Sequence, residues 1–182
     1  MLRTGLDPRL TYHSPAHTED VLQQVERIAA AEKITDARLL LLMKIAALFH
    51  DTGFLRTYKG HEEMSCLILH EIVDGFQFED SEMKMMNGMI MATRIPQLPV
   101  TLPEKIICDA DLDYLGRDDF ESISNSLKTE FFAYHVIKNE EEWNQLQVNF
   151  FESHSYFTSS SLQDRYPIKM KHLEMLKQKL LR

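Results

Sequence analysis

The segment from Leu39 to Phe54 reads LLLLMKIAALFHDTGF and joins an apolar run to a polar pair. Leu, Met, Ala and Ile in such a run are typical of a helix that is buried in the core. Where the run ends, His50 and Asp51 stand side by side, and Gly53 follows as a signal that the helix stops. The sequence therefore predicts a buried helix whose end presents an imidazole and a carboxylate.

The rest of the chain also carries helical patterns. Leu, Met, Glu and Lys are frequent, whereas the 182 residues include only six Gly and six Pro. Ser14 followed by Pro15 is typical of a helix start, and Asp36 can cap the helix that reaches His50. We expect helices from Pro15 onward and over residues 36–50, 61–74, 79–93, 103–116, 120–138, 140–153 and 162–181, with a loop at 94–103. The sequence thus predicts one all-α domain of about seven or eight helices over residues 1–182, with a core at about 13–115 and C-terminal helices at about 117–181.

Charge and cysteine content narrow the class of protein. The net charge is -8 and the pI is about 5.5, which argues against a broad basic face for extended nucleic acid or an anionic membrane. A small phosphorylated ligand needs only a local positive pocket, so this class of partner remains. Cys66 and Cys108 form no CxxC pair, and no apolar segment has the length of a signal peptide core or a membrane span. We therefore expect a cytoplasmic protein, and the oligomeric state stays open.

Histidine and aspartate residues within or next to apolar helical segments indicate a metal site. Upstream of the doublet of His50 and Asp51, YHSPAHTEDV places His17 in the first turn of a helix. Downstream of it, ICDADLDYLG places Asp111 in an apolar helix. A carboxylate there is costly unless a charge compensates it, and a divalent cation is a strong compensation. His17, His50, Asp51 and Asp111 would give a mixed nitrogen and oxygen site for one divalent ion. This set suits Mn, Fe, Co, Ni or Zn, and Mg less well.

These residues carry a resemblance to a known family. The H…HD…D pattern resembles the HD-domain superfamily of metal-dependent phosphohydrolases, and YHSPAHTEDV is similar to a segment of cyclic-nucleotide phosphodiesterases. The segment EEWNQLQVNFFESHSYFT resembles a C-terminal part of a bacterial branch of HD proteins. The resemblance implies an HD-type helical fold, with His17, His50, Asp51 and Asp111 as metal ligands and Asp51 also as a catalytic residue. It implies that His13 acts as the general acid for the leaving oxygen.

A second metal is less well supported. His61 and Glu62 open a helix soon after the doublet, where they could hold a second metal, contact phosphate or simply start the helix. Asp109 could hold the ligand residues in place by hydrogen bonding without touching the metal, or it could be an exposed neighbour of Asp111. Relatives with two metals usually bring another histidine from the helix before the last aspartate, whereas this chain reads MIMATRIP there. A second metal is therefore a candidate, and one metal is the expectation.

Three basic residues are candidates for binding the substrate phosphate. They are Arg56, Lys59 and Arg94. An arginine could bind the phosphate through two parallel hydrogen bonds and a lysine through its single positive charge, although lone basic residues are usually solvated. The predicted function is the metal-dependent hydrolysis of a small phosphate ester, a nucleotide or cyclic nucleotide, as a monoester or a diester. Two alternatives remain: a non-catalytic helical module that binds proteins, and a di-iron oxygenase. The oxygenase needs two more histidines on separate helices, but His61 and His70 fall on one.

Overall fold

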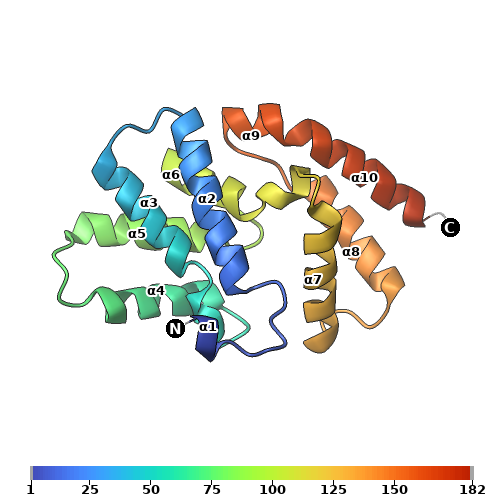
Figure 1. Ribbon diagram of the computed structural model, residues 1–182, viewed down its shortest axis with the longest axis horizontal. Coiled ribbons are helices and arrows are strands. Elements are labelled where there is room, and N and C mark those ends of the chain that lie inside the picture. Colours follow the sequence, from blue (N-terminus) through green and yellow to red (C-terminus); the bar gives the residue numbers. More distant parts are fainter. Residues whose placement is uncertain (1, 181–182) are drawn as a thin grey trace.

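The computed structural model describes residues 2–180, and every regular element in this range is a helix (Figure 1). No strand occurs among these residues, so the predicted all-α class is confirmed. The helices are α1 (Leu2–Gly5), α2 (Pro15–Ala31), α3 (Ala37–Phe49), α4 (His61–Val73), α5 (Asp80–Ala92), α6 (Leu102–Asp111), α7 (Phe120–Ala133), α8 (Glu140–Ser153), α9 (Ser159–Asp164) and α10 (Tyr166–Leu180), with the short 3₁₀ helices η1 (Thr52–Leu55) and η2 (Asp113–Gly116).

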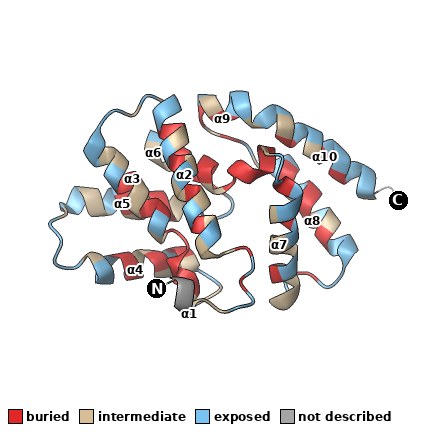
Figure 2. Ribbon diagram, in the orientation of Figure 1, coloured by how far each residue is buried: buried red, intermediate tan, exposed pale blue. Residues whose placement is uncertain are grey.

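The first half of the chain builds one apolar core. Helices α2, α3, α5 and α6 pack on one another, and Val21, Val25 and Ile28 line one face of α2 at helical spacing. Met43 on α3 and Met89 on α5 are fully buried in the same cluster. In Figure 2, buried stretches of these helices lie where the helices pack on one another. The apolar run of α3 is therefore a platform that is fixed on several sides.

The second half builds a separate apolar cluster around η2. Its buried members come from η2, from the residue before it, from α7, α8 and α10, and in one case from the segment before α2: Tyr12, Leu112, Tyr114, Leu115, Phe120, Val148, Phe151, Leu173 and Leu176. In Figure 1, α7, α8 and α10 lie on the opposite side of the molecule from α3, α4 and α5. Helix α6 belongs to the first cluster and η2, which follows it, to the second. The end of α6 therefore stands at the junction of the two clusters.

Several predicted boundaries are wrong. The helix expected at 103–116 ends at Asp111, and a 3₁₀ turn follows because Asp113 is buried beside Arg27 and Arg165. The helix expected at 120–138 ends at Ala133, and His135 takes a left-handed φ of 56°. The helix expected at 162–181 is divided into α9 and α10, with Pro167 in the first turn of α10, since proline has no N–H for the bond that a continuous helix needs.

Helix α1 and the 3₁₀ helix η1 are elements that the pattern did not predict. Within residues 2–180, no helix combines the length and the apolar content that are needed to cross a membrane.

Candidate metal centre

The structure brings the four predicted metal ligands together. His17 Nε2 lies 3.1 Å from Asp111 Oδ1 and 3.4 Å from Asp51 Oδ2. His50 Nε2 lies 3.2 Å from Asp51 Oδ2 and 3.6 Å from Asp111 Oδ1. The two imidazole Nε2 atoms are 3.4 Å apart. Two nitrogen and two oxygen atoms from separate parts of the chain therefore converge on one small region.

Each candidate ligand lies at or next to the end of a helix. Ser14 caps α2 by accepting a hydrogen bond from the His17 N–H at 3.4 Å, and Pro15 fixes the first turn. His50 is the C-terminal cap of α3, and Asp51 follows it directly. Asp111 is the last residue of α6. Helix ends let short side chains reach a common point while the buried bodies of the helices hold the backbone in place.

The turn after α3 is held from both sides. His50 Nδ1 lies 2.8 Å from the Ala47 carbonyl oxygen, so a proton on Nδ1 is donated there and Nε2 is the ring atom that faces the cluster. Ser65 donates to the His50 carbonyl at 2.6 Å and accepts from the Gly53 N–H at 2.8 Å. A Cβ on Gly53 would lie 1.9 Å from the His61 carbonyl oxygen, so a side chain at this position would push α4 away.

Charge in the cluster favours a bound cation. Burial would raise the pKa of Asp51, but the adjacent His50 lowers it, and the net shift is downward. Burial would also raise the pKa of Asp111, but hydrogen bonds from His17 and His50 lower it to about 2. Both carboxylates are therefore anionic at neutral pH, which is the form that binds a metal.

The residues present fit a divalent ion. Ligand atoms held at about 2.0–2.2 Å from a metal in tetrahedral or octahedral geometry lie about 2.8–3.6 Å from one another. The five separations above fall in this range. Asp51 Oδ2 is buried, and no hydrogen-bond partner for it occurs in the part of the chain that the structure describes. His17, His50 and Asp51 thus form a group that can hold a metal ion. Asp111 lies beside this group, 3.1 Å from His17 Nε2, and its role as a fourth ligand stays a prediction.

His13 sits beside this cluster and is held by a glutamate that the sequence analysis missed. His13 Nδ1 is hydrogen-bonded to Glu130 Oε1 of α7, and the Glu130 side chain is fully buried. The other oxygen of Glu130 accepts the backbone N–H groups of Tyr12 at 3.0 Å and His13 at 3.1 Å. The His13 ring stacks on Phe54 with centroids 4.1 Å apart. A signal for Glu130 was present, because it is a carboxylate next to two phenylalanines in TEFFAYH.

The electrostatics of His13 follow from these contacts. Burial alone would lower the pKa of His13, but the hydrogen bond to Glu130 and the charge of Asp51 raise it, and the net shift is upward. The imidazolium form of His13 is therefore more stable than that of an ordinary histidine. A titratable imidazole is thus held beside the candidate ligands without being one of them.

Of the residues proposed for a second metal, two approach the cluster and one does not. His61 Nε2 lies 3.5 Å from Asp51 Oδ1 and 3.6 Å from Glu62 Oε1, so both residues stand beside the doublet. Asp109 is fully buried and its two oxygens accept the N–H groups of Phe157 and Thr158, at 2.9 and 2.8 Å. Asp109 therefore ties α6 to the segment before α9, while a metal role for His61 and Glu62 stays a prediction.

The three basic candidates differ in their placement. Arg56 forms a two-pronged ion pair with Glu71, at 2.6 and 2.9 Å, on the exposed side of α4. Lys59 is exposed at the surface. Arg94 is paired with Glu63 and lies 3.7 Å from Glu62 Oε2, at the edge of the site. Both arginines are thus paired with glutamates, and the partners of Arg94 include Glu62, which lines the cavity beside the cluster.

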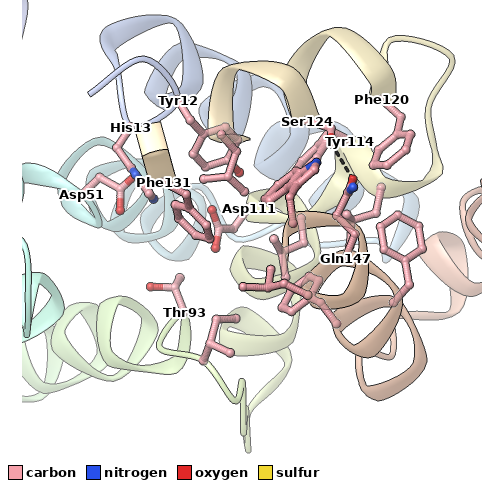
Figure 3. A pocket seen from close by; sticks show the side chains of 18 of the residues that line it. Tyr12, His13, Asp51, Thr93, Asp111, Tyr114, Phe120, Ser124, Phe131 and Gln147 are labelled. Atoms are coloured by element: carbon pink, nitrogen blue, oxygen red, sulfur yellow. Dashed lines mark hydrogen bonds between the residues drawn. The ribbon is translucent and has the colours of Figure 1, made fainter. Parts of the chain in front are cut away.

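A cavity of about 170 Å³ opens onto the cluster (Figure 3). Figure 3 shows His13 and Asp51 on one side of this cavity and Phe120, Ser124 and Gln147 on the other. Asp111 and Phe131 lie between these two groups. Two of the candidate ligands, Asp51 and Asp111, therefore line one end of a pocket whose other end is formed largely by α7 and α8.

No family model matches this chain, and no curated protein matches its sequence.

Proposed function

We propose that this protein is a metal-dependent hydrolase of a small phosphate ester. The observation that carries the proposal is the convergence of His17, His50, Asp51 and Asp111 on one buried point, with a protonatable His13 beside it. Paired imidazole and carboxylate ligands next to an acid group suit the hydrolysis of phosphate esters.

The four ligand residues would hold one divalent ion at the ends of α2, α3 and α6. When bound, such an ion supplies Lewis-acid polarisation of a phosphoryl oxygen and lowers the pKa of water. In the hydrolysis, the ester P–O bond breaks and the oxygen of water forms the new P–O bond. The departing oxygen takes a proton from His13, and the proton that water loses restores His13.

Glu130 supports the role that we assign to His13. Its buried carboxylate fixes the ring through Nδ1 and stabilises the imidazolium, so Nε2 is left to donate. Glu130 acts through His13 and is therefore a positioning residue.

The substitution Asp51→Ala tests the ligand set. We expect loss of the bound metal and of hydrolysis in a panel of phosphomonoesters and phosphodiesters assayed with Mn, Mg, Co, Ni and Zn, because one anionic ligand is removed. Helical content should stay largely intact, because the buried apolar residues of α3 hold the platform. Elemental analysis, circular dichroism and the activity panel measure these three properties.

The matched control is Asp118→Ala, which removes an exposed aspartate. It should retain both metal and activity. Full metal occupancy in Asp51→Ala would show that the ligand set is wrong. A wild-type protein with no metal and no activity would favour the interaction module, and two irons per chain would favour the oxygenase.

A further inference from the structure

The inner part of the cavity is apolar. Its walls are formed by Leu115, Phe120, Leu127, Trp143, Leu146 and Phe150. Ser124 and Gln147 are the polar residues of this inner wall, and Ser124 Oγ donates to Gln147 Oε1 at 2.8 Å (Figure 3). Among the described residues, no lysine or arginine lines the cavity. The charged groups are confined to the end that holds the candidate metal ligands.

The size of the cavity limits what can enter it. Its volume is about 170 Å³. An apolar protein cavity of about 150 Å³ is known to stay dry and to bind benzene, whereas sites for drug-sized ligands are about 300–1,000 Å³. The space beside the cluster therefore matches one aromatic ring or a short branched hydrocarbon chain.

The chemistry of the wall opposes a nucleoside. A sugar and a base would bring several hydroxyl, amine and carbonyl groups against phenylalanine and leucine side chains, and buried polar groups without partners are strongly unfavourable. Ser124 and Gln147 are only two polar side chains, too few to pair with all the polar groups of a sugar and a base. An apolar group meets no such penalty in this space.

We propose that the substrate is a phosphate ester of a compact apolar alcohol, whose hydrocarbon part occupies the cavity between α7 and α8. This proposal rests on the proposed phosphohydrolase function and names its substrate class. The phosphate would lie at the four-residue cluster and the hydrocarbon against Leu127 and Trp143, because one continuous cavity joins these two ends.

The first measurement is kinetic. We compare kcat/KM for 3-methylbutyl phosphate, glycerol 3-phosphate and AMP, each of which releases a primary alcohol. The wild-type protein should prefer 3-methylbutyl phosphate by at least about tenfold, since each methylene in an apolar pocket changes kcat/KM about 10–200-fold. Leu127→Phe, which fills the cavity, should lower this preference at least about tenfold, through a loss of kcat/KM for 3-methylbutyl phosphate. Leu146→Phe tests the opposite wall in the same way, should Leu127→Phe not fold.

The second measurement needs no turnover. Trp143 is the single tryptophan of the chain and lines the cavity, so its fluorescence should change in a saturable way when 3-methylbutanol is added. The change should be lost in Leu127→Phe and kept in Leu162→Phe, which alters an exposed leucine on α9.

The outcomes separate the two proposals. Hydrolysis that prefers AMP or glycerol 3-phosphate, and that Leu127→Phe does not alter, would overturn the apolar substrate class and leave the phosphohydrolase function in place. Absence of hydrolysis with every ester would overturn the function, and the substrate class with it, whatever 3-methylbutanol does to the fluorescence.

Discussion

His13 precedes the N-cap of α2, so the helix does not fix its ring. The hydrogen bond to Glu130 and the stacking on Phe54 do so instead. The His13 backbone N–H is also bonded to Glu130, at 3.1 Å, which fixes the peptide as well as the imidazole. A proton donor needs this control of position, because proton transfer depends on hydrogen-bond reach to the leaving oxygen.

The substitution His13→Ala should keep the metal and lower turnover by about 10²–10⁴-fold, the usual contribution of a positioned proton donor. The loss should be much smaller for a nitrophenyl ester, because nitrophenolate departs without a proton. Steady-state kinetics on a nitrophenyl ester and an alkyl ester of the same phosphate, with metal content measured in parallel, test this expectation.

Glu130→Gln provides the matched variant. It keeps the shape of the side chain and removes the charge that stabilises the imidazolium, so the pKa of His13 should fall. The decrease in rate that accompanies loss of the His13 proton should therefore occur at a lower pH than in the wild type. An equal loss for both esters in His13→Ala would mean that His13 positions substrate or structure, and loss of the metal would place it among the ligands.

At the scale of single residues, the sequence predicted which groups converge but not what holds them. His17, His50, Asp51 and Asp111 stood out as polar residues at the ends of apolar helices, and their side chains do meet. Glu130 is separated from His13 by 117 positions, and no pattern in one sequence links such residues. The ion pair of Arg56 with Glu71 was invisible for the same reason.

At the scale of helices, the helical spacing of apolar residues predicted most of the elements but placed some of their ends wrongly. Residues 103–116 continue a helical pattern through η2, yet Asp113 is fully buried and lies 2.6 Å from Arg27 and 2.8 Å from Arg165. Both arginines come from distant parts of the chain. Such tertiary ion pairs can outweigh the local preference for continuing a helix, and they cannot be read from a periodicity.

Helix α10 carries a buried lysine that joins it to the end of α8. Lys169 is 1% exposed, and its Nζ donates to the His154 carbonyl oxygen at 2.5 Å. Burial lowers the pKa of Lys169 from its ordinary 10.5 to about 8. The unfolded chain therefore binds more protons than the folded chain between these two values. Stability from this group rises with pH in that window, since stability increases wherever the unfolded state is the more protonated one.

Comparison with Lys169→Met should reveal this dependence. The free energy of unfolding of the wild type minus that of Lys169→Met should increase from pH 7 to pH 9.5, by on the order of 1 kcal/mol. Urea unfolding at the two pH values measures the difference. Lys171→Met, which removes an exposed lysine from the same helix, should show no such increase. A difference that stays constant with pH would mean that Lys169 ionises as freely in the folded chain as in the unfolded one.

At the scale of the whole molecule, the candidate ligands connect parts that pack separately. His17, His50 and Asp111 come from α2, α3 and α6, which share the first apolar cluster, while Tyr12 and Leu112 beside them belong to the second. An ion at this point would cross-link three helices and border both clusters. In an unfolded chain His17, the adjacent His50 and Asp51, and Asp111 would be far apart, so a cation would bind the folded state preferentially.

Metal binding should therefore raise the melting temperature. At a free metal concentration about 100 times Kd, selective binding to the folded state contributes about 2.7 kcal/mol. For a chain of this size each kcal/mol corresponds to about 2–4 °C, so the shift should be roughly 5–11 °C with Mn, Ni or Zn and should be reversed by a chelator. Asp111→Ala should lose most of the shift, because one anionic ligand is gone and the link to α6 is broken. Asp118→Ala, on the exposed surface, should keep all of it. An equal shift in both variants would mean that the stabilising ion binds elsewhere on the protein, and the centre at the ends of α2, α3 and α6 would have to be abandoned.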